Sequence, residues 1–407
     1  MTNDANGVSP MHRIYLDHAA TTPLDPRVFE AMLPFLKEQY GNASSVHALG
    51  RKARFAVEES RERIAAHLEA EPGEIIFTSG GTEADNAALR GMLHSERRGL
   101  ITSATEHEAI LRTAEALEEA GHPVITLRPQ AHGAVTPGQV AEALTEQIGL
   151  VSLLVANNEI GTLTPVEAIA EVCQAQAVPL HCDAVQAAGL FALKVDRLGV
   201  DLMTLSGHKI YGPKGVGVLY VRGGLDFQPL VLGGAQERRR RGGTENVAAV
   251  VGMAKALDLM RVEAEARVAH LTALRDRLRA NLQQALGAAF VFNTPFDSGV
   301  GIAPHIVNIA FPPQDGQPLD GEMLLLNLDM EGVMVSAGSA CTSGALEPSH
   351  VLLALGRDRD TASASVRFSL GKDNTPEEID RAIDHLTTIL QRMRHQRRSV
   401  ATGSSVK

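Results

Sequence analysis

The sequence predicts an α/β fold with a mostly parallel sheet and a second, smaller α+β domain. Three observations lead to it: apolar runs alternate with helical patterns in the first half, a long helical pattern follows, and the last third mixes strands and helices. Strands that alternate with helices of about a dozen residues indicate βαβ units, whose helices cover both faces of a sheet. The length of 407 residues is too great for one typical core, which favours two domains.

The expected elements follow from apolar periodicity and from the glycines and prolines that interrupt it. In the first half we expect strands at 13–16, 74–78, 100–102, 124–127, 150–155 and 178–182, and helices at 26–40, 52–70, from 82, and at 108–120, 136–145 and 166–175. Two further strands, 201–205 and 216–221, enclose a tight loop. Thr244 is expected to cap a helix that runs without proline to about residue 286 and bridges the domains. Beyond it we expect strands at 305–311 and 365–368 and helices at 320–330 and 376–393.

These elements define the expected domains. We assign residues 24–264 to the large domain, and residues 1–23 together with 265–407 to the small domain. The small domain then carries a loop of small residues around Cys341, at about 330–350.

Composition excludes several classes of function. The net charge of −10 argues against nucleic acid as the main partner. The sequence contains no apolar run of about 18 residues, so no membrane span is predicted. The N-terminus lacks the basic start and apolar core of a signal peptide. Cys173, Cys182 and Cys341 do not make a disulfide framework. We therefore expect a cytoplasmic protein with reduced thiols and with neither nucleic acid nor membrane as a partner.

Lys209 lies in the loop between two predicted strands, in the run Ser206-Gly207-His208-Lys209. A lysine crowded against a sheet edge has its pKa lowered, because burial disfavours the charged form. A neutral lysine amine can form a Schiff base with a carbonyl cofactor. The alternative is a surface lysine in a turn.

Two other strand ends suit an anionic, flat ligand. The turn around Gly80, Gly81 and Thr82 joins a strand to a helix and offers free N–H groups and hydroxyls, although such turns also serve plain packing. Asp183 ends a strand and could hold a protonated ring nitrogen, with Gln186 reaching a ring hydroxyl; the alternative for Asp183 is a helix N-cap.

The remaining candidates are single polar residues at loops and strands. His107 could stack on a flat ring or move protons, and Asn158 could bind a polar ligand, although both also suit surface turns. Arg367 lies in a strand and either faces water or binds a substrate carboxylate. Cys341 is surrounded by small residues, where a thiolate can react, whereas Cys173 and Cys182 are expected to pack. The run Arg238 to Arg241 is most simply a solvated loop.

Taken together and in order, these segments resemble the cysteine desulfurases, pyridoxal-phosphate (PLP) enzymes of the aminotransferase class V type. The resemblance covers about residues 13–390. It rests on nine motifs: Tyr15-Leu16-Asp17-His18-Ala19-Ala20-Thr21-Thr22-Pro23, Gly41-Asn42-Ala43-Ser44-Ser45-Val46-His47, Phe77-Thr78-Ser79-Gly80-Gly81-Thr82-Glu83, Glu106-His107, Asn157-Asn158-Glu159-Ile160-Gly161, His181-Cys182-Asp183-Ala184-Val185-Gln186, Ser206-Gly207-His208-Lys209, Gly243-Thr244-Glu245-Asn246 and Gly338-Ser339-Ala340-Cys341. Gly81 and Gly207 depart from the alanines usual in the family, which removes no reacting group.

The resemblance implies PLP-dependent fold type I and a role for each candidate. Lys209 would be the Schiff-base lysine and Cys341 the cysteine that receives sulfur. The phosphate would be held by Thr82, Ser206, His208, the backbone of Gly81 and, from the second subunit of a homodimer, Thr244. The ring would contact His107, Asp183 and Gln186. Asn158 and Arg367 would hold the substrate carboxylate.

The implied reaction converts L-cysteine to L-alanine and leaves a persulfide on Cys341 for iron–sulfur cluster assembly or another sulfur-transfer pathway. His107 is the candidate base or proton shuttle for the thiol. The stretch after Cys341 resembles the long-loop group associated with iron–sulfur clusters, so an iron–sulfur scaffold or another acceptor protein is the implied partner. No resident metal ion is implied, although Cys341 could contact a transferred cluster. The alternatives are a selenocysteine lyase, another class V lyase or aminotransferase, and a non-catalytic scaffold.

Overall fold

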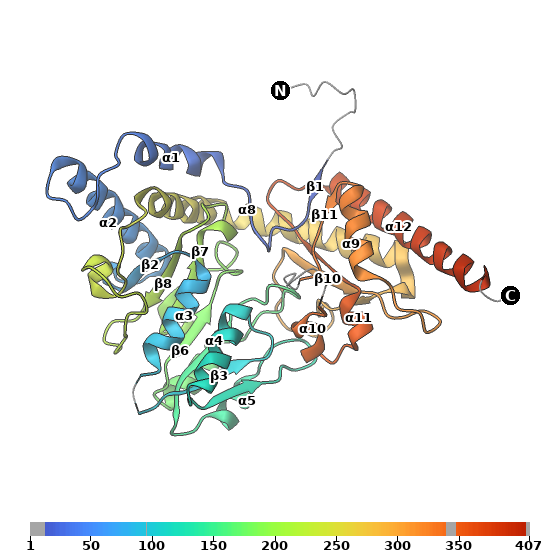
Figure 1. Ribbon diagram of the computed structural model, residues 1–407, viewed down its shortest axis with the longest axis horizontal. Helices are drawn as coiled ribbons and strands as arrows, with labels where there is room; N and C mark the ends of the chain where they lie inside the picture. The colour runs from blue at the N-terminus through green and yellow to red at the C-terminus, as the bar shows by residue number, and fades with distance from the viewer. Residues whose placement is uncertain (1–12, 95, 339–346, 404–407) are drawn as a thin grey trace.

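The computed structural model describes residues 13–94, 96–338 and 347–403 (Figure 1). Its main sheet has seven strands in the order β2-β8-β7-β6-β5-β3-β4. Only β8 runs antiparallel to its neighbours, so the sheet is mixed and mostly parallel, as predicted. The strands are β2 (Ile75–Thr78), β3 (Gly99–Ser103), β4 (Val124–Leu127), β5 (Ile148–Leu154), β6 (Leu180–Asp183), β7 (Leu202–Ser206) and β8 (Gly217–Val221).

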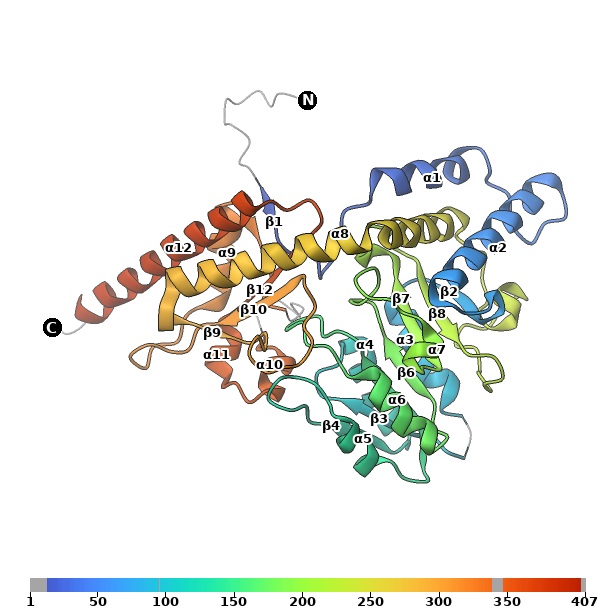
Figure 2. The same ribbon diagram turned by 180° about the vertical axis from the view of Figure 1, so that it is seen from behind.

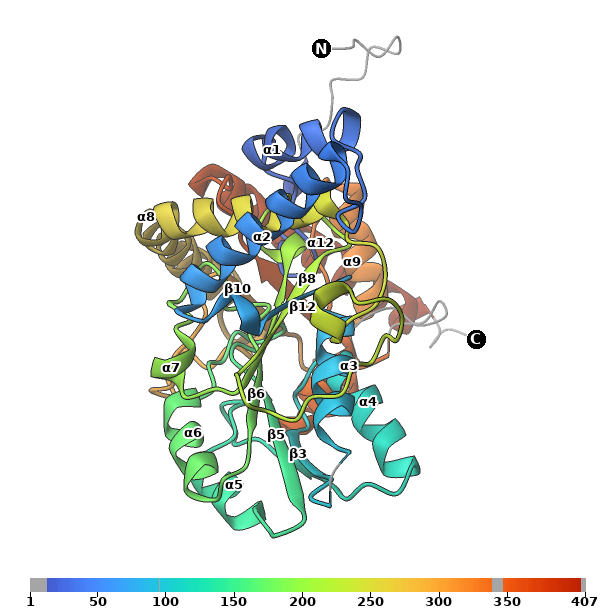
Figure 3. The same cartoon turned by 90° about the vertical axis from the view of Figure 1, so that its left-hand side faces the viewer.

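Helices cover both faces of this sheet because its strands are apolar on both faces. Ile75 and Phe77 belong to one apolar cluster and Ile76, between them, to another. Figure 3 shows α6 and α7 on one side of the sheet and α3 and α4 on the other. The helices of this part are α1 (Pro26–Lys37), α2 (Ala48–Leu68), α3 (Gly81–Met92), α4 (Glu108–Glu119), α5 (Pro137–Ala143), α6 (Val166–Ala175) and α7 (Val195–Leu198), with short 3₁₀ turns η1 (Pro72–Glu74), η2 (Gly207–Lys209) and η3 (Gln236–Arg239).

The long helix α8 (Val247–Leu286) joins the two halves of the protein (Figures 1 and 2). Met253 and Met260 pack into the apolar cluster under the main sheet, whereas Leu271 and Leu282 belong to a separate cluster. The cap predicted at Thr244 is wrong by two residues. Asn246 caps the helix, since its side chain accepts a hydrogen bond from the N–H of Ala249 at 3.2 Å.

The second cluster is an α+β unit, as predicted. A three-stranded antiparallel sheet has the order β12-β10-β9, and β1 pairs in parallel with β11. Ile14 and Leu16 lie in this cluster, so the N-terminal strand packs with the C-terminal third. The domain boundaries expected at 23/24 and 264/265 stay a prediction. The elements are β1 (Ile14–Tyr15), η4 (Gly287–Ala289), β9 (Val291–Phe292), β10 (Ile306–Ala310), α9 (Gly321–Met330), β11 (Val333–Met334), α10 (His350–Ala354), α11 (Arg359–Ser363), β12 (Ser365–Ser369) and α12 (Pro376–Gly403).

Across the part of the chain that the structure describes, no helix combines the length and apolar character needed to cross a membrane.

A buried ion pair anchors the loop that contains the four arginines. Arg61 donates through Nη1 and Nη2 to the two carboxylate oxygens of Glu237 at 2.7 and 2.8 Å, and the N–H of Phe77 donates to Glu237 at 2.9 Å. The prediction of a solvated loop is therefore confirmed for Arg238, which is exposed. It is wrong for Arg241, which is half-buried and forms an ion pair with Glu83.

We expect Glu237→Ala to lower the free energy of unfolding by about 3–5 kcal/mol, because it removes the buried partner of the Arg61 guanidinium and leaves only the half-exposed Glu58. The matched control is Arg238→Ala, which removes a half-exposed ion pair to Glu58 and should cost less than about 1 kcal/mol. Urea unfolding of both variants measures the difference. Equal losses would contradict the assigned role of Glu237.

Candidate active site

A cavity of about 420 Å³ lies where the carboxyl ends of the sheet strands meet the second cluster. Ligands of open α/β sheets bind at this edge, because the loops that follow parallel strands converge there. Ten of the twelve residues predicted from the sequence line the cavity: Gly81, Thr82, His107, Asn158, Asp183, Gln186, Ser206, His208, Lys209 and Arg367.

Lys209 ends the 3₁₀ turn η2, directly after β7. Its Nζ donates to the carbonyl oxygens of Ala19 at 2.5 Å and Ala20 at 2.8 Å. Burial, and then the charge of Arg367, lower the pKa of Lys209 to about 8, against the opposite effect of Asp183 and Asp17. A pKa of about 8 leaves roughly a tenth of this amine uncharged at pH 7, far more than for a lysine in water. Because Lys209 also lines the cavity, the alternative of an ordinary surface lysine is wrong.

Close packing explains the glycine before the histidine of this motif. A Cβ on Gly207 would lie 2.8 Å from the carbonyl oxygen of Pro213 and 2.9 Å from a methyl carbon of Val216. The loop is thus pressed against the strand that follows it, which restricts the freedom of Lys209.

Asp183 ends β6 and is buried. Its Oδ1 accepts a hydrogen bond from the N–H of Val185 at 2.9 Å, and no helix begins there, so Asp183 is not a helix N-cap. Burial raises the pKa of Asp183, while the nearby His107 and Lys209 oppose that shift. A cationic ligand in the cavity would favour the ionised form of this carboxyl.

His107 is the N-cap of α4, and its Nδ1 accepts a hydrogen bond from the N–H of Ala109 at 3.1 Å. The ring is open to the cavity but surrounded by protein, and this desolvation lowers the pKa of His107. A neutral ring that accepts at Nδ1 carries its proton on Nε2. His107 therefore presents an N–H donor rather than a lone pair.

One end of the cavity gathers hydrogen-bond donors. The first residues of α3, Gly81 and Thr82, line the cavity, and this helix N-terminus has no side-chain cap. The buried hydroxyl of Ser206 has no protein partner, and Nδ1 of His208 lies 3.1 Å from the hydroxyl oxygen of Thr21. Uncapped N–H groups at the positive end of a helix, beside free hydroxyls, suit a phosphate.

Arg367 brings a buried cation from β12 to the same cavity. Its Nη1 donates to the carbonyl oxygen of Asn158 at 2.9 Å and its Nη2 to Asp17 at 2.9 Å, while its Nε is buried without a partner. Arg367 does not face water, so that alternative is wrong, while binding of a substrate carboxylate stays a prediction.

Several residues at the site had no role in the sequence analysis. Asp17 fixes Arg367, the carbonyls of Ala19 and Ala20 hold Lys209, and Asp85 and Ser336 line the cavity. Asp17, Ala19 and Ala20 lie in the first of the nine motifs. The sequence analysis used this motif as part of the family resemblance but gave none of its residues a role. Asp85 lies on α3 three residues after Thr82 and therefore on the same face of the helix, a spacing that could have indicated it.

Two predicted residues are not among the cavity-lining residues. Thr244 is exposed and lines a separate cavity of about 230 Å³ with Ser79, Glu237 and Arg241. Cys341 lies outside the described residues, although Gly338, shortly before it, lines the main cavity. Cys173 and Cys182 are buried and pack in the core, as predicted, and burial raises the pKa of Cys173 to about 12.

Residues 14–382 match the family model described as aminotransferase class V. The chain belongs to this family, whose members depend on PLP, and the predicted fold type and cofactor are thereby confirmed.

The similar curated proteins define a narrower group. The chain is 43% identical over 384 residues to "Cysteine desulfurase IscS" of Dictyoglomus turgidum, covering 94% of this chain and 95% of the relative. It is 43% identical over 387 residues to "Putative cysteine desulfurase IscS 1" of Bacillus subtilis, covering 94% and 100%. A solved NifS-like protein has a TM-score of 0.85 at 35% identity, covering 93% and 99%, and DndA from Streptomyces lividans has 0.73 at 38%, covering 87% and 99%. The predicted resemblance to cysteine desulfurases is confirmed.

The residues of the cavity fit PLP. The unpartnered Ser206 hydroxyl and the uncapped N-terminus of α3 suit its phosphate, the buried Asp183 suits its ring nitrogen, and the amine of Lys209 suits its carbonyl. The donors and the carboxyl lie around one cavity, as a ligand with a phosphate at one end and a basic ring at the other requires.

In the protein freed of cofactor, Lys209 should react with an amine-specific reagent at half its maximal rate near pH 8, because the reactive neutral form increases as the pH rises through the pKa. Arg367→Leu should move this midpoint to higher pH, since the guanidinium charge lowers the pKa. Mass spectrometry of the labelled peptides measures the rate. Labelling of the exposed Lys214 gives the reference for reagent dose, and a midpoint for Lys209 near 10 would contradict the expectation.

Proposed function

We propose that the protein is a PLP-dependent cysteine desulfurase that converts L-cysteine to L-alanine and transfers the sulfur to Cys341 as a persulfide. One observation carries the proposal: an amine with a pKa of about 8 shares a cavity with a buried carboxyl, an imidazole N–H and a buried guanidinium. The identity of 43% to proteins named cysteine desulfurases supports it.

In this proposal each residue of the cavity contacts a defined part of the ligands. Thr82, Ser206, His208 and the backbone of Gly81 hold the phosphate of PLP, while Asp183, Gln186 and a stacked His107 contact its ring. Arg367 and Asn158 bind the carboxylate of L-cysteine, for which the unpartnered Nε of Arg367 is a free donor. When bound, PLP draws electrons away from the Cα of the amino acid attached to it.

Lys209 performs the proton transfer at Cα. When it is not attached to PLP, the Lys209 amine would remove the Cα proton of the substrate. Its lowered pKa serves this step, because an amine must be uncharged to act as a base. The carbonyl oxygens of Ala19 and Ala20 accept hydrogen bonds from Nζ and hold it beside the cavity. Because they carry no full negative charge, they do not bind the amine as an ion pair would.

Cys341 performs the sulfur transfer. Its thiolate attacks the sulfur of the substrate, an S–S bond forms, and the C–S bond breaks with its electron pair left on the carbon skeleton. Protonation of that carbon gives the methyl group, and return of the proton from Lys209 to Cα would complete alanine. A free thiol has a pKa of about 8.5, so Cys341 must lose a proton before it attacks.

His107 serves this step as a proton shuttle rather than as a simple base. Its Nδ1 accepts the Ala109 N–H, so its Nε2 carries a proton into the cavity. To accept the thiol proton at Nε2, His107 would first carry its own proton on Nδ1 instead, which requires the hydrogen bond from the Ala109 N–H to break.

Exposure of the wild-type enzyme to L-cysteine should add one sulfur atom to Cys341 and release alanine, as measured by mass spectrometry and amino-acid analysis. Lys209→Ala should abolish both products, because no amine remains to bind PLP or remove the proton. Cys341→Ser should abolish persulfide formation. The buried Cys173 and Cys182 are internal controls that should stay unmodified. Alanine release that persists in Cys341→Ser would favour a different class V lyase, and release from selenocysteine alone would favour a selenocysteine lyase.

We further propose a homodimer in which Thr244 of one subunit contacts the phosphate in the other. Exposed large apolar side chains support this, because surfaces of this kind mark protein contacts. They lie on α1, α2 and two loops, at Phe29, Leu36, Tyr40, Val46, Phe55 and Leu232. The exposure of Thr244 away from its own cavity supports it as well. A cytoplasmic location, and an iron–sulfur scaffold or another sulfur acceptor as partner, belong to the same proposal and rest on the family resemblance.

Thr244→Ala should weaken PLP binding about 10- to 100-fold, the worth of one hydrogen bond to a charged group. A heterodimer of one Lys209→Ala chain and one Thr244→Ala chain tests the geometry. If Thr244 acts across the interface, one of its two sites is intact and binds PLP with wild-type affinity. If Thr244 acts within its own chain, both sites are damaged, and no site of wild-type affinity is found by titration.

A further inference from the structure

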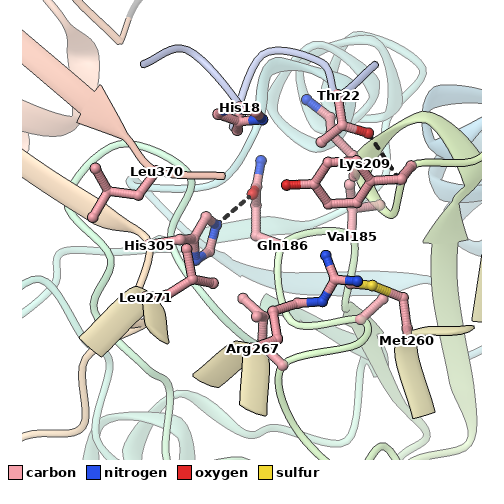
Figure 4. A pocket seen from close by; sticks show the side chains of 13 residues that line it. His18, Thr22, Val185, Gln186, Lys209, Met260, Arg267, Leu271, His305 and Leu370 are labelled. Atoms are coloured by element: carbon pink, nitrogen blue, oxygen red, sulfur yellow. Dashed lines mark hydrogen bonds between the residues drawn. The ribbon is translucent and has the colours of Figure 1, made fainter. Parts of the chain in front are cut away.

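A small second cavity of about 30 Å³ lies behind Gln186, between its loop, α8 and the residues before β10 (Figure 4). Lys209, Val185 and Gln186 line both this cavity and the larger one. The proposed reaction leaves two of its lining residues unexplained, His305 and Arg267, and both are more than nine-tenths buried.

His305 makes one defined hydrogen bond, to the amide of Gln186. Its Nε2 lies 3.1 Å from Oε1 of Gln186, and the Nε2 of that amide donates to the carbonyl oxygen of Ala19 at 2.9 Å. Figure 4 shows the imidazole and the amide facing each other. The opposite amide orientation would place two oxygens, those of Gln186 and Ala19, against each other, so the observed orientation is the one that satisfies both neighbours.

The tautomer of His305 follows from this network. Burial, with smaller effects from His18, Arg367 and Lys209, lowers the pKa of His305 to about 3, so the ring is neutral. Its single proton must be on Nε2, because Nε2 faces an oxygen. Nδ1 of His305 is then a buried lone pair, while Nε and Nη1 of Arg267 are buried donors without a protein partner. A cavity of this size has room for about two waters, which could connect the donors of Arg267 to that lone pair.

The carbonyl oxygen of Ala19 connects the hydrogen-bonded pair of His305 and Gln186 to the amine of Lys209. Ala19 accepts hydrogen bonds from both Gln186 and Lys209. One N–H of the Gln186 amide is thus used, and the second remains for a ligand in the larger cavity, which Gln186 also lines. Rotation of the amide by half a turn would present an oxygen there instead.

We propose that His305 is a positioning residue, which holds the amide of Gln186 in the one orientation that directs an N–H at the ring hydroxyl of PLP. The proposal rests on the proposed contact between Gln186 and PLP and adds a residue outside the nine motifs. His305 contacts neither PLP nor the substrate and acts through Gln186 alone.

The test compares the wild-type holoenzyme with two variants by the pH at which the absorbance of bound PLP changes. A donor aimed at the ring hydroxyl stabilises its ionised form, so its loss favours the more protonated state of the bound cofactor. His305→Phe keeps a ring of similar shape without a donor and should raise the midpoint by about 0.5–1 pH unit, the shift expected from one hydrogen bond. His305→Gln places an amide N–H near the position of Nε2 and should restore the wild-type midpoint. The charged groups around this centre, Lys209, Asp183, Asp17, His107 and Arg367, are the same in all variants.

A double variant establishes that the effect passes through Gln186. In a Gln186→Leu background, His305→Phe should shift the midpoint no further, because the amide that it orients is absent. A shift that persists in this background, a wild-type midpoint in His305→Phe, or equal shifts in the phenylalanine and glutamine variants would each overturn the proposal. His305→Asn, whose amide is too short to reach Gln186, replaces the phenylalanine variant if that chain does not fold.

These outcomes are independent of the proposed reaction. Alanine formation from L-cysteine by the wild-type enzyme is measured in parallel. Its absence would refute the desulfurase activity and leave the comparison of absorbance midpoints valid, because that comparison needs only bound PLP.

Discussion

The burial of the Lys209 amine beside a second cation is the constraint on which the site depends. An amine in water stays charged at neutral pH, so the protein has to make the charged form costly. It does so by placing Nζ between two backbone carbonyls, which accept hydrogen bonds without supplying a full negative charge, and near Arg367. Asp17 lies close enough to favour the ammonium form, but its carboxylate is engaged by the guanidinium of Arg367. The ion pair that fixes Arg367 thus also limits the negative charge that Lys209 experiences.

This arrangement explains why the active site needs both halves of the protein. The sheet supplies Lys209, Asp183 and His107 at its strand ends, whereas Ala19 and Ala20 follow β1 and Arg367 lies in β12, in the second cluster. The helix α8 holds the two clusters at a fixed spacing, because its first half packs under the main sheet and its second half in the other core. A shift of one cluster against the other would change the distance between the amine and the groups that set its pKa.

Much of this could be predicted from the sequence, and the failures have physical reasons. Apolar runs located the strands because the central ones, such as β6 and β7, are buried on both faces, and the polar residues at and after the ends of β6 and β7 marked the site. The cap at Asn246 was missed because both Thr244 and Asn246 are good N-caps and only tertiary packing chooses between them. The burial of Glu237 could not be inferred, because its partner Arg61 lies far away in the sequence. Asp17 and His305 were missed for the same reason, since each acts on a residue more than a hundred positions away.

Three buried carboxyl groups differ in how readily they ionise, and this difference bears on the binding of PLP. Asp85, Glu106 and Asp183 are all buried near one another, and burial raises the pKa of each. Three ionised carboxylates at this depth would repel one another without compensating cations, so the isolated protein favours their protonated forms. Asp183 differs from the other two, because His107 and Lys209 favour its ionised form and its Oδ1 accepts the N–H of Val185. It is therefore the carboxyl that a protonated ring nitrogen could most readily ionise, whereas burial favours the protonated forms of Asp85 and Glu106. In the proposed arrangement, binding of PLP would be linked to the charge of Asp183, and the same linkage would keep the ring nitrogen protonated.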